Sequence, residues 1–190
     1  MKLFERRPKS QLPTEEEAAK LERRIAEIKA EVNNENFVTA SEMAVKCAED
    51  YRGKNTFGEA CCSYLVGHSL ICQHLKNISP ADQTKAEMSS ADYNRAKKYL
   101  TRSSEIYDFF SRNKKFERNR RLKCAIVLID LAMLESFVAK WDEAVEVCAR
   151  SLDICKEYEF KEGATLATRL MFNLKTQKLF LDIKDFVGMQ

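Results

Sequence analysis

One spacing recurs three times along this chain of 190 residues. An aromatic residue is followed by alanine three positions later, and then by small or medium residues four and seven positions beyond that alanine. Positions three, four and seven apart lie on one face of an α-helix, and small side chains on that face let a second helix approach closely. The spacing therefore predicts the second helix of a repeated pair of antiparallel helices. The three segments are Phe37-Ala40-Ala44-Cys47, Tyr93-Ala96-Leu100-Ser103 and Trp141-Ala144-Cys148-Ser151.

The composition supports an all-α fold. The chain has only 5 glycines and 3 prolines, whereas all-β and Rossmann-type folds need both residues at their many tight turns. Thr14 and Glu17 form a capping-box signature, and Gly53 suits the end of a helix. We predict seven helices, over residues 15–33, 37–52, 57–77, 90–112, 116–138, 141–157 and 162–179.

These helices predict one domain over residues 14–190 after a flexible basic tail over 1–13. Repeat 1 spans 15–52, repeat 2 spans 57–112, repeat 3 spans 116–157, and a capping helix spans 162–181. Counting from Gly67 at a regular interval places the next aromatic at residue 76, but it occurs at Tyr93. About seventeen residues, including a loop at 78–89, therefore interrupt repeat 2.

The repeated positions resemble the second helix of a tetratricopeptide repeat, and Leu128, Leu131 and Ala132 match positions of its first helix. The interrupted second repeat further resembles the NASP/Sim/Hif family of histone chaperones. The segments that carry this likeness are Asn36-Phe37-Val38-Thr39-Ala40, Gly67-His68-Ser69-Leu70-Ile71, Ala139-Lys140-Trp141-Asp142-Glu143-Ala144 and Ser151-Leu152-Asp153-Ile154.

The resemblance implies a tetratricopeptide-like solenoid that binds a helical segment of a core histone without catalysis. The implied partner is histone three, with histone four beside it, and other chromatin-assembly factors are further candidates. It also implies a nuclear and cytoplasmic protein, and self-association is left open. Glu135, Glu143 and Glu146 on the outer helices are candidates for screening the positive charge of a histone.

In a stack of helix pairs, the first helix of each pair lines the concave side. A mostly apolar channel with a few polar groups suits a bound amphipathic helix. The plain alternative for every one of these positions is core packing between the two helices. The predicted groove residues are Tyr64, His68, Ile71, Asp130, Met133 and Phe137.

The cysteines favour a reducing compartment and no metal centre. There are seven, an odd number without any CxxC pair, and most lie on apolar stripes, where a free thiol behaves as a small apolar group. A site made of Cys61 or Cys62 with His68 and Cys72 matches no familiar zinc spacing. With two histidines and no motif of a phosphate loop, metalloprotease or nucleophile elbow, we expect no enzyme and no cofactor.

A basic cluster precedes and begins the predicted fifth helix. It could attract phosphate or act as a nuclear-import signal, although a solvated helix start explains it as well. Direct nucleic-acid binding and membrane binding are not expected. Two alternatives to the histone chaperone stay open: a general repeat adaptor, for example one akin to the SNAP attachment proteins, and a nucleic-acid binder that uses this cluster. Its residues are Arg112, Lys114, Lys115, Arg118, Arg120 and Arg121, and Lys123 ends it.

Overall fold

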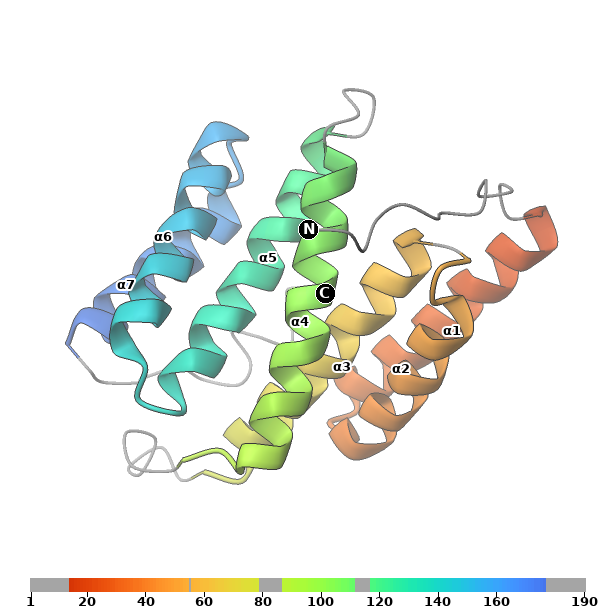
Figure 1. Cartoon of the computed structure of the whole chain (residues 1–190), viewed down its shortest axis with the longest axis horizontal. Coiled ribbons are helices and arrows are strands. Elements are labelled where there is room, and N and C mark those ends of the chain that lie inside the picture. The colour runs from red at the N-terminus through yellow and green to blue at the C-terminus, as the bar shows by residue number, and fades with distance from the viewer. Residues whose placement is uncertain (1–13, 55, 79–86, 112–116, 177–190) are drawn as a thin grey trace, which may run out of the picture.

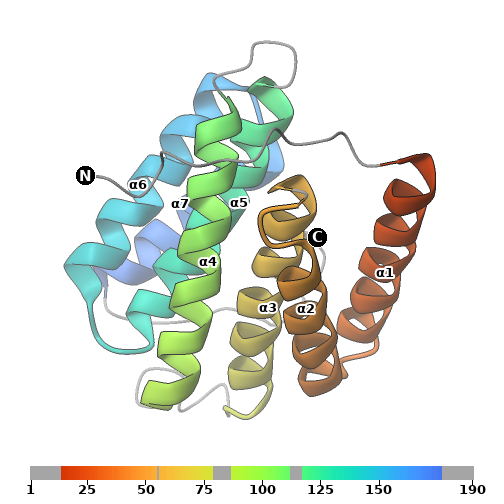
Figure 2. The same ribbon diagram turned by 45° about the vertical axis from the view of Figure 1, so that its right-hand side comes forward.

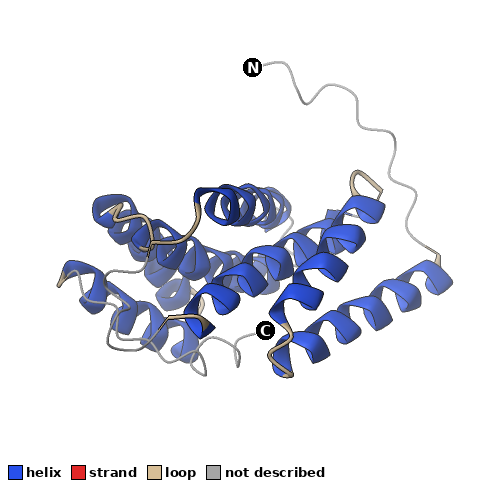
Figure 3. Cartoon of the chain, turned by 90° about the horizontal axis from the view of Figure 1, so that it is seen from below, coloured by secondary structure: helices blue, strands red, loops and turns tan. Residues whose placement is uncertain are grey.

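A computed structural model describes residues 14–54, 56–78, 87–111 and 117–176, and within these ranges the chain forms seven α-helices and no strand (Figure 3). This confirms the all-α prediction. The predicted tail over 1–13, most of the loop over 78–89 and the end of the capping helix lie outside the described residues. The helices are α1 (Glu15–Asn33), α2 (Phe37–Tyr51), α3 (Thr56–Lys76), α4 (Ser90–Ser111), α5 (Glu117–Ser136), α6 (Trp141–Glu157) and α7 (Lys161–Lys175).

Local chemistry explains where the first two helices begin and end. The Thr14 hydroxyl accepts a hydrogen bond from the Glu17 backbone N–H at 3.2 Å, and the Glu17 carboxylate accepts one from the Thr14 backbone N–H at 2.9 Å. This is the predicted capping box, which satisfies two backbone donors that lack partners within α1. After α2, Gly53 has a φ of +71°, a conformation that glycine adopts without steric cost.

Three of the turns between helices have the same conformation. Each has one residue with a positive φ, namely Glu35, Ala139 and Glu159. In each, the next N–H bonds to a carbonyl five residues earlier, as in a Schellman motif, and a new helix follows at once. The three turns therefore reverse the chain in the same way. These bonds run from Asn36 to Glu31 (2.9 Å), from Lys140 to Glu135 (3.0 Å) and from Phe160 to Cys155 (2.8 Å).

The helices pack in chain order, from α1 at one end of the molecule to α6 and α7 at the other (Figures 1 and 2). Every helix contacts its successor. The odd-numbered helices also contact one another, α1 with α3, α3 with α5 and α5 with α7, whereas no two even-numbered helices pack to this extent within the described ranges. The odd-numbered helices thus form one continuous layer. Among the described helices, none is both long and apolar enough to cross a membrane.

The small residues of the threefold spacing all lie at helix contacts. Every one of the nine non-aromatic positions is completely buried, and two of them, Ser103 and Ser151, are polar. The Ser103 hydroxyl donates to the carbonyl of Ala60 at 2.8 Å, and the Ser151 hydroxyl donates to that of Ala125, also at 2.8 Å. The two bonds span 43 and 26 residues, so they differ by the 17 residues of the predicted interruption. α3 with α4 and α5 with α6 are therefore packed in matching register.

The aromatic positions of the spacing are less uniform than the small ones. Phe37 and Trp141 each directly follow a Schellman turn and begin a helix, while Tyr93 is the fourth residue of α4. Phe37 and Tyr93 are buried, but Trp141 is only partly buried. The difference at Tyr93 arises because the interruption, and not a tight turn, precedes α4.

Candidate functional site

All six predicted groove residues are buried, with exposed fractions between 0% and 7%. The expectation that they line an open channel is therefore corrected: the chain itself covers these side chains. The physical reason is that α3 and α5 pack directly against each other, so residues that face away from the even-numbered helices meet across this contact. The six are Tyr64, His68, Ile71, Asp130, Met133 and Phe137.

A polar cluster lies inside the contact between α3 and α5. The His68 Nδ1 atom is 2.8 Å from the Asp130 Oδ2 atom, and the Tyr64 hydroxyl is 3.2 Å from the same nitrogen. The Cys72 Sγ atom lies 3.6 Å from His68 Nε2. The second Asp130 oxygen, Oδ1, is buried without a hydrogen-bond partner. One helix thus supplies the phenol, imidazole and thiol, and the other supplies the carboxylate.

Burial by itself would lower the pKa of His68, because it disfavours the imidazolium. Cys72 and Asp130 outweigh burial and raise that pKa well above the usual value. Thiol, imidazole and carboxylate in this order resemble the arrangement of a nucleophilic triad. However, Cys72, His68 and Asp130 have no exposed surface, so a substrate cannot reach the thiol. The arrangement instead joins α3 to α5 by a buried ion pair.

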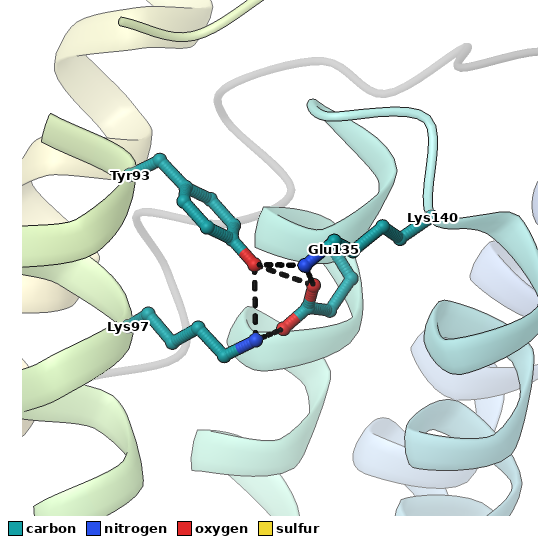
Figure 4. Close-up of polar contacts among 4 residues, drawn as sticks. All are labelled: Tyr93, Lys97, Glu135 and Lys140. Carbon is teal, nitrogen blue, oxygen red and sulfur yellow. Dashed lines mark hydrogen bonds and ion pairs between the residues drawn. The ribbon is translucent and has the colours of Figure 1, made fainter. Parts of the chain in front are cut away.

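A second buried carboxylate joins α4, α5 and the turn that precedes α6 (Figure 4). The Tyr93 hydroxyl donates to Glu135 at 2.8 Å. The ammonium group of Lys97 lies 2.8 Å from the Glu135 carboxylate, and that of Lys140 lies 3.9 Å from it. Glu135 is only 5% exposed, so it does not screen a partner's charge as the sequence suggested. Its negative charge is compensated within the chain.

Part of the predicted basic cluster lies among the described residues. Arg112, Lys114 and Lys115 lie outside the described residues. The other three guanidinium groups have partners within the chain, because the N-terminal end of α5 packs beside α4 and the turn after α6. Arg118 donates to the carbonyl of Tyr158 at 3.2 Å, Arg120 donates to that of Phe110, and Arg121 pairs with Asp108 at 2.7 Å.

The cysteines have the packing role that their positions predict. Six of the seven are buried, all seven are free thiols, and burial raises the pKa of Cys148 to about 12. Within the described ranges, no group of three His, Cys, Asp or Glu side chains could hold a metal ion. Cys47 and Cys62 form a contact that the sequence does not predict, with sulfur atoms 2.9 Å apart between α2 and α3.

A small pocket lies beside the buried cluster, where α1, α3, α4 and α5 meet. Lys29 and Lys123 both line it. The sequence places Lys123 at the end of the basic cluster and gives Lys29 no role, so it does not bring the two lysines together. One feature of the sequence hints that both lysines lie close to the core. Each is next to an apolar residue that proves to be buried, Ile28 before Lys29 and Cys124 after Lys123. We call this site the lysine pocket; its residues are Lys29, Cys61, Tyr64, Tyr107, Lys123, Ile126 and Val127.

Comparison with known proteins finds no matching family model, no similar curated protein and no similar solved structure.

Proposed function

We propose that this chain is a non-catalytic, tetratricopeptide-like solenoid that binds a segment of another polypeptide on the layer of odd-numbered helices. The observation that carries the proposal is the matching register of two helix pairs, in which Ser103 binds Ala60 and Ser151 binds Ala125 at the same distance. Repeats that stack in one register present their first helices side by side along one surface. Such a surface is typical of proteins that bind extended or helical peptides.

Two further observations favour binding over catalysis. The one arrangement of a thiol, an imidazole and a carboxylate among the described residues is fully buried. The polar groups that remain accessible on the odd-numbered helices include Lys29 and Lys123 of the lysine pocket, which are groups suited to charge recognition. A general repeat adaptor is the function class that this combination supports best.

Photo-crosslinking from two positions tests the proposal. A photo-reactive amino acid replaces Ala26, which is exposed on α1 one helical turn from Lys29. The matched control replaces Arg150, which is exposed on α6 in the even-numbered layer. We expect crosslinks to a defined polypeptide from position 26 and none to that polypeptide from position 150. Equal crosslinking from both positions, or none from position 26, overturns the proposal.

A second candidate is the histone chaperone that the NASP resemblance implies. The observation in its favour is the acidic outer surface of α6, which would attract a basic partner. Its exposed carboxylates outnumber its exposed cations, Arg150 and Lys156. The test is retention of histones three and four on the immobilised protein at moderate salt, with Glu143→Gln combined with Glu146→Gln as the comparison. Failure to retain histones, or retention that this double substitution does not weaken, ends the candidate. The acidic residues are Asp142, Glu143, Glu146, Asp153 and Glu157.

A further inference from the structure

The lysine pocket holds two cations that have no anionic partner. Lys29 comes from α1 and Lys123 from α5, and both line the same small cavity. No carboxylate lies within ion-pair distance of either among the described residues. Some other cations on the helices that line the pocket do have a carboxylate partner, for example Arg24 of α1 with Asp50 at 2.7 Å and Arg102 of α4 with Glu59 at 2.7 Å. What distinguishes this pocket is that two lysines of separate helices line one small cavity, with no carboxylate of the described residues beside them.

Leaving these charges unpaired has an energetic cost. Burial lowers the pKa of Lys123, and the positive charge of Lys29 lowers it further. Both effects disfavour the charged form, because an ammonium group loses hydration and faces a like charge. A single substitution of either lysine would remove this cost. Stabilising substitutions of this kind are easy to find, and a protein commonly forgoes them where function needs the less stable arrangement. An external anion would remove the repulsion.

We propose that the lysine pocket binds the carboxylates of an acidic segment of a partner polypeptide. This inference rests on the proposed function, and it names the chemistry of the partner. A side-chain carboxylate on such a segment would enter the pocket and offset the repulsion between the two lysines. The burial of Lys123 would strengthen its ion pair, because screening by water is weaker there than at an exposed site.

The walls of the pocket favour a small anion next to an apolar group. Tyr64, Ile126 and Val127 line the same cavity as the two lysines and supply its apolar surface. The cavity volume is about 20 Å³, which suits a planar carboxylate and is too small for a nucleotide base. A basic segment is disfavoured here, since it would add a third positive charge. An acidic peptide with apolar residues next to the bound carboxylate fits both features.

Fluorescence anisotropy with a labelled peptide of alternating glutamate and leucine tests the inference, with the glutamine-for-glutamate peptide as the control ligand. The variants are Lys29→Gln, Lys123→Gln and the double substitution. Lys156→Gln is the matched control, because Lys156 is exposed on α6 and away from the pocket. We expect each single substitution to weaken binding roughly fivefold and the double substitution more than about tenfold. Lys156→Gln should leave affinity unchanged within roughly twofold.

Folding is checked separately by urea denaturation. Removing either lysine relieves repulsion, so the variants should be at least as stable as the parent, and lost binding then reports on the pocket. The inference is overturned if the glutamate peptide does not bind, if the glutamine peptide binds equally, or if the double substitution has no effect. Tighter binding of a phosphoserine peptide than of the glutamate peptide would also overturn it, in favour of a phosphate site.

The two proposals fail in different ways. If position 26 still crosslinks to a defined polypeptide while the glutamate peptide does not bind, the polypeptide-binding function stands and the acidic chemistry of the partner is refuted. If neither experiment gives a signal, both proposals are refuted.

Discussion

Replacing Gly67 by alanine perturbs the closest contact between α3 and α4. A Cβ atom at this position would lie 2.6 Å from Cδ2 of Leu100 and closer still to its Cγ. Leu100 is completely buried, so its side chain has no free space to turn into. In repeat 3 the matching positions hold Ala132 and Cys148. The same helix contact is therefore made by a glycine against a leucine in repeat 2 and by an alanine against the smaller cysteine in repeat 3.

The expected magnitudes follow from this geometry. Alanine in place of Gly67 gains about 1 kcal/mol of helix propensity, but overpacking costs about 1–3 kcal/mol and more where the neighbour cannot move. We expect Gly67→Ala to lower the free energy of unfolding by about 1–2 kcal/mol. Leu100→Cys leaves a cavity and should lower it by about 2–3 kcal/mol.

The double variant is the decisive measurement. The new Cβ atom of alanine fills part of the space that Leu100→Cys vacates, so the double variant should be about 1–2 kcal/mol more stable than the sum of the two changes predicts. Urea denaturation followed by far-UV circular dichroism gives the four free energies of unfolding. If the two losses of free energy simply add, the residues at positions 67 and 100 do not compensate each other as Ala132 and Cys148 would. That result would refute the register that matches the two pairs.

Three further predictions follow from other contacts. The pKa of His68 is raised in the folded chain, so the stability that its pair with Asp130 contributes should be complete below about pH 6.5. That stability should be lost as the pH rises through the raised pKa. Asp130→Asn should cost about 3–5 kcal/mol and remove this slope, and urea midpoints that show the same slope in both proteins would contradict this. Ala139→Gly should stabilise the fold by about 0.5–1 kcal/mol, because Ala139 has a φ of +57° that strains any residue with a Cβ atom; an unchanged or lower urea midpoint would argue against it. Refolding from urea in the presence of a thiol oxidant such as diamide, which accepts two electrons and two protons, should join Cys47 to Cys62 by a disulfide. The unfolded chain exposes both thiols, which are buried in the fold, and folding brings their sulfur atoms 2.9 Å apart; peptide mapping by mass spectrometry under non-reducing conditions would detect the joined peptides, and separate peptides would speak against it.

The sequence predicts some residues of the candidate site but not how the helices around them pack. The sequence does select His68 and Asp130, because counting along each helix from Gly67 and Ala132 places both on the predicted concave side. Periodicity cannot tell whether such a face is open or covered, since that depends on how closely two helices approach. The same limit explains why the sequence does not bring Lys29 and Lys123 together. They are 94 positions apart in the printed sequence, and only the packing of α1 and α5 around α3 brings them to one pocket.

Local chemistry determined the helices themselves. Scarce glycine and proline, the capping box at Thr14 and the threefold aromatic–alanine spacing are local properties of the chain, so they can be read without knowing what packs against what. Tertiary packing decided which polar groups are satisfied. Glu135 is neutralised by lysines of α4 and of the turn before α6, while the two lysines that line the pocket have no ion pair with a carboxylate in the described part of the chain. Electrostatic pairing depends on distances between separate helices, and those distances exist only once the layers have assembled.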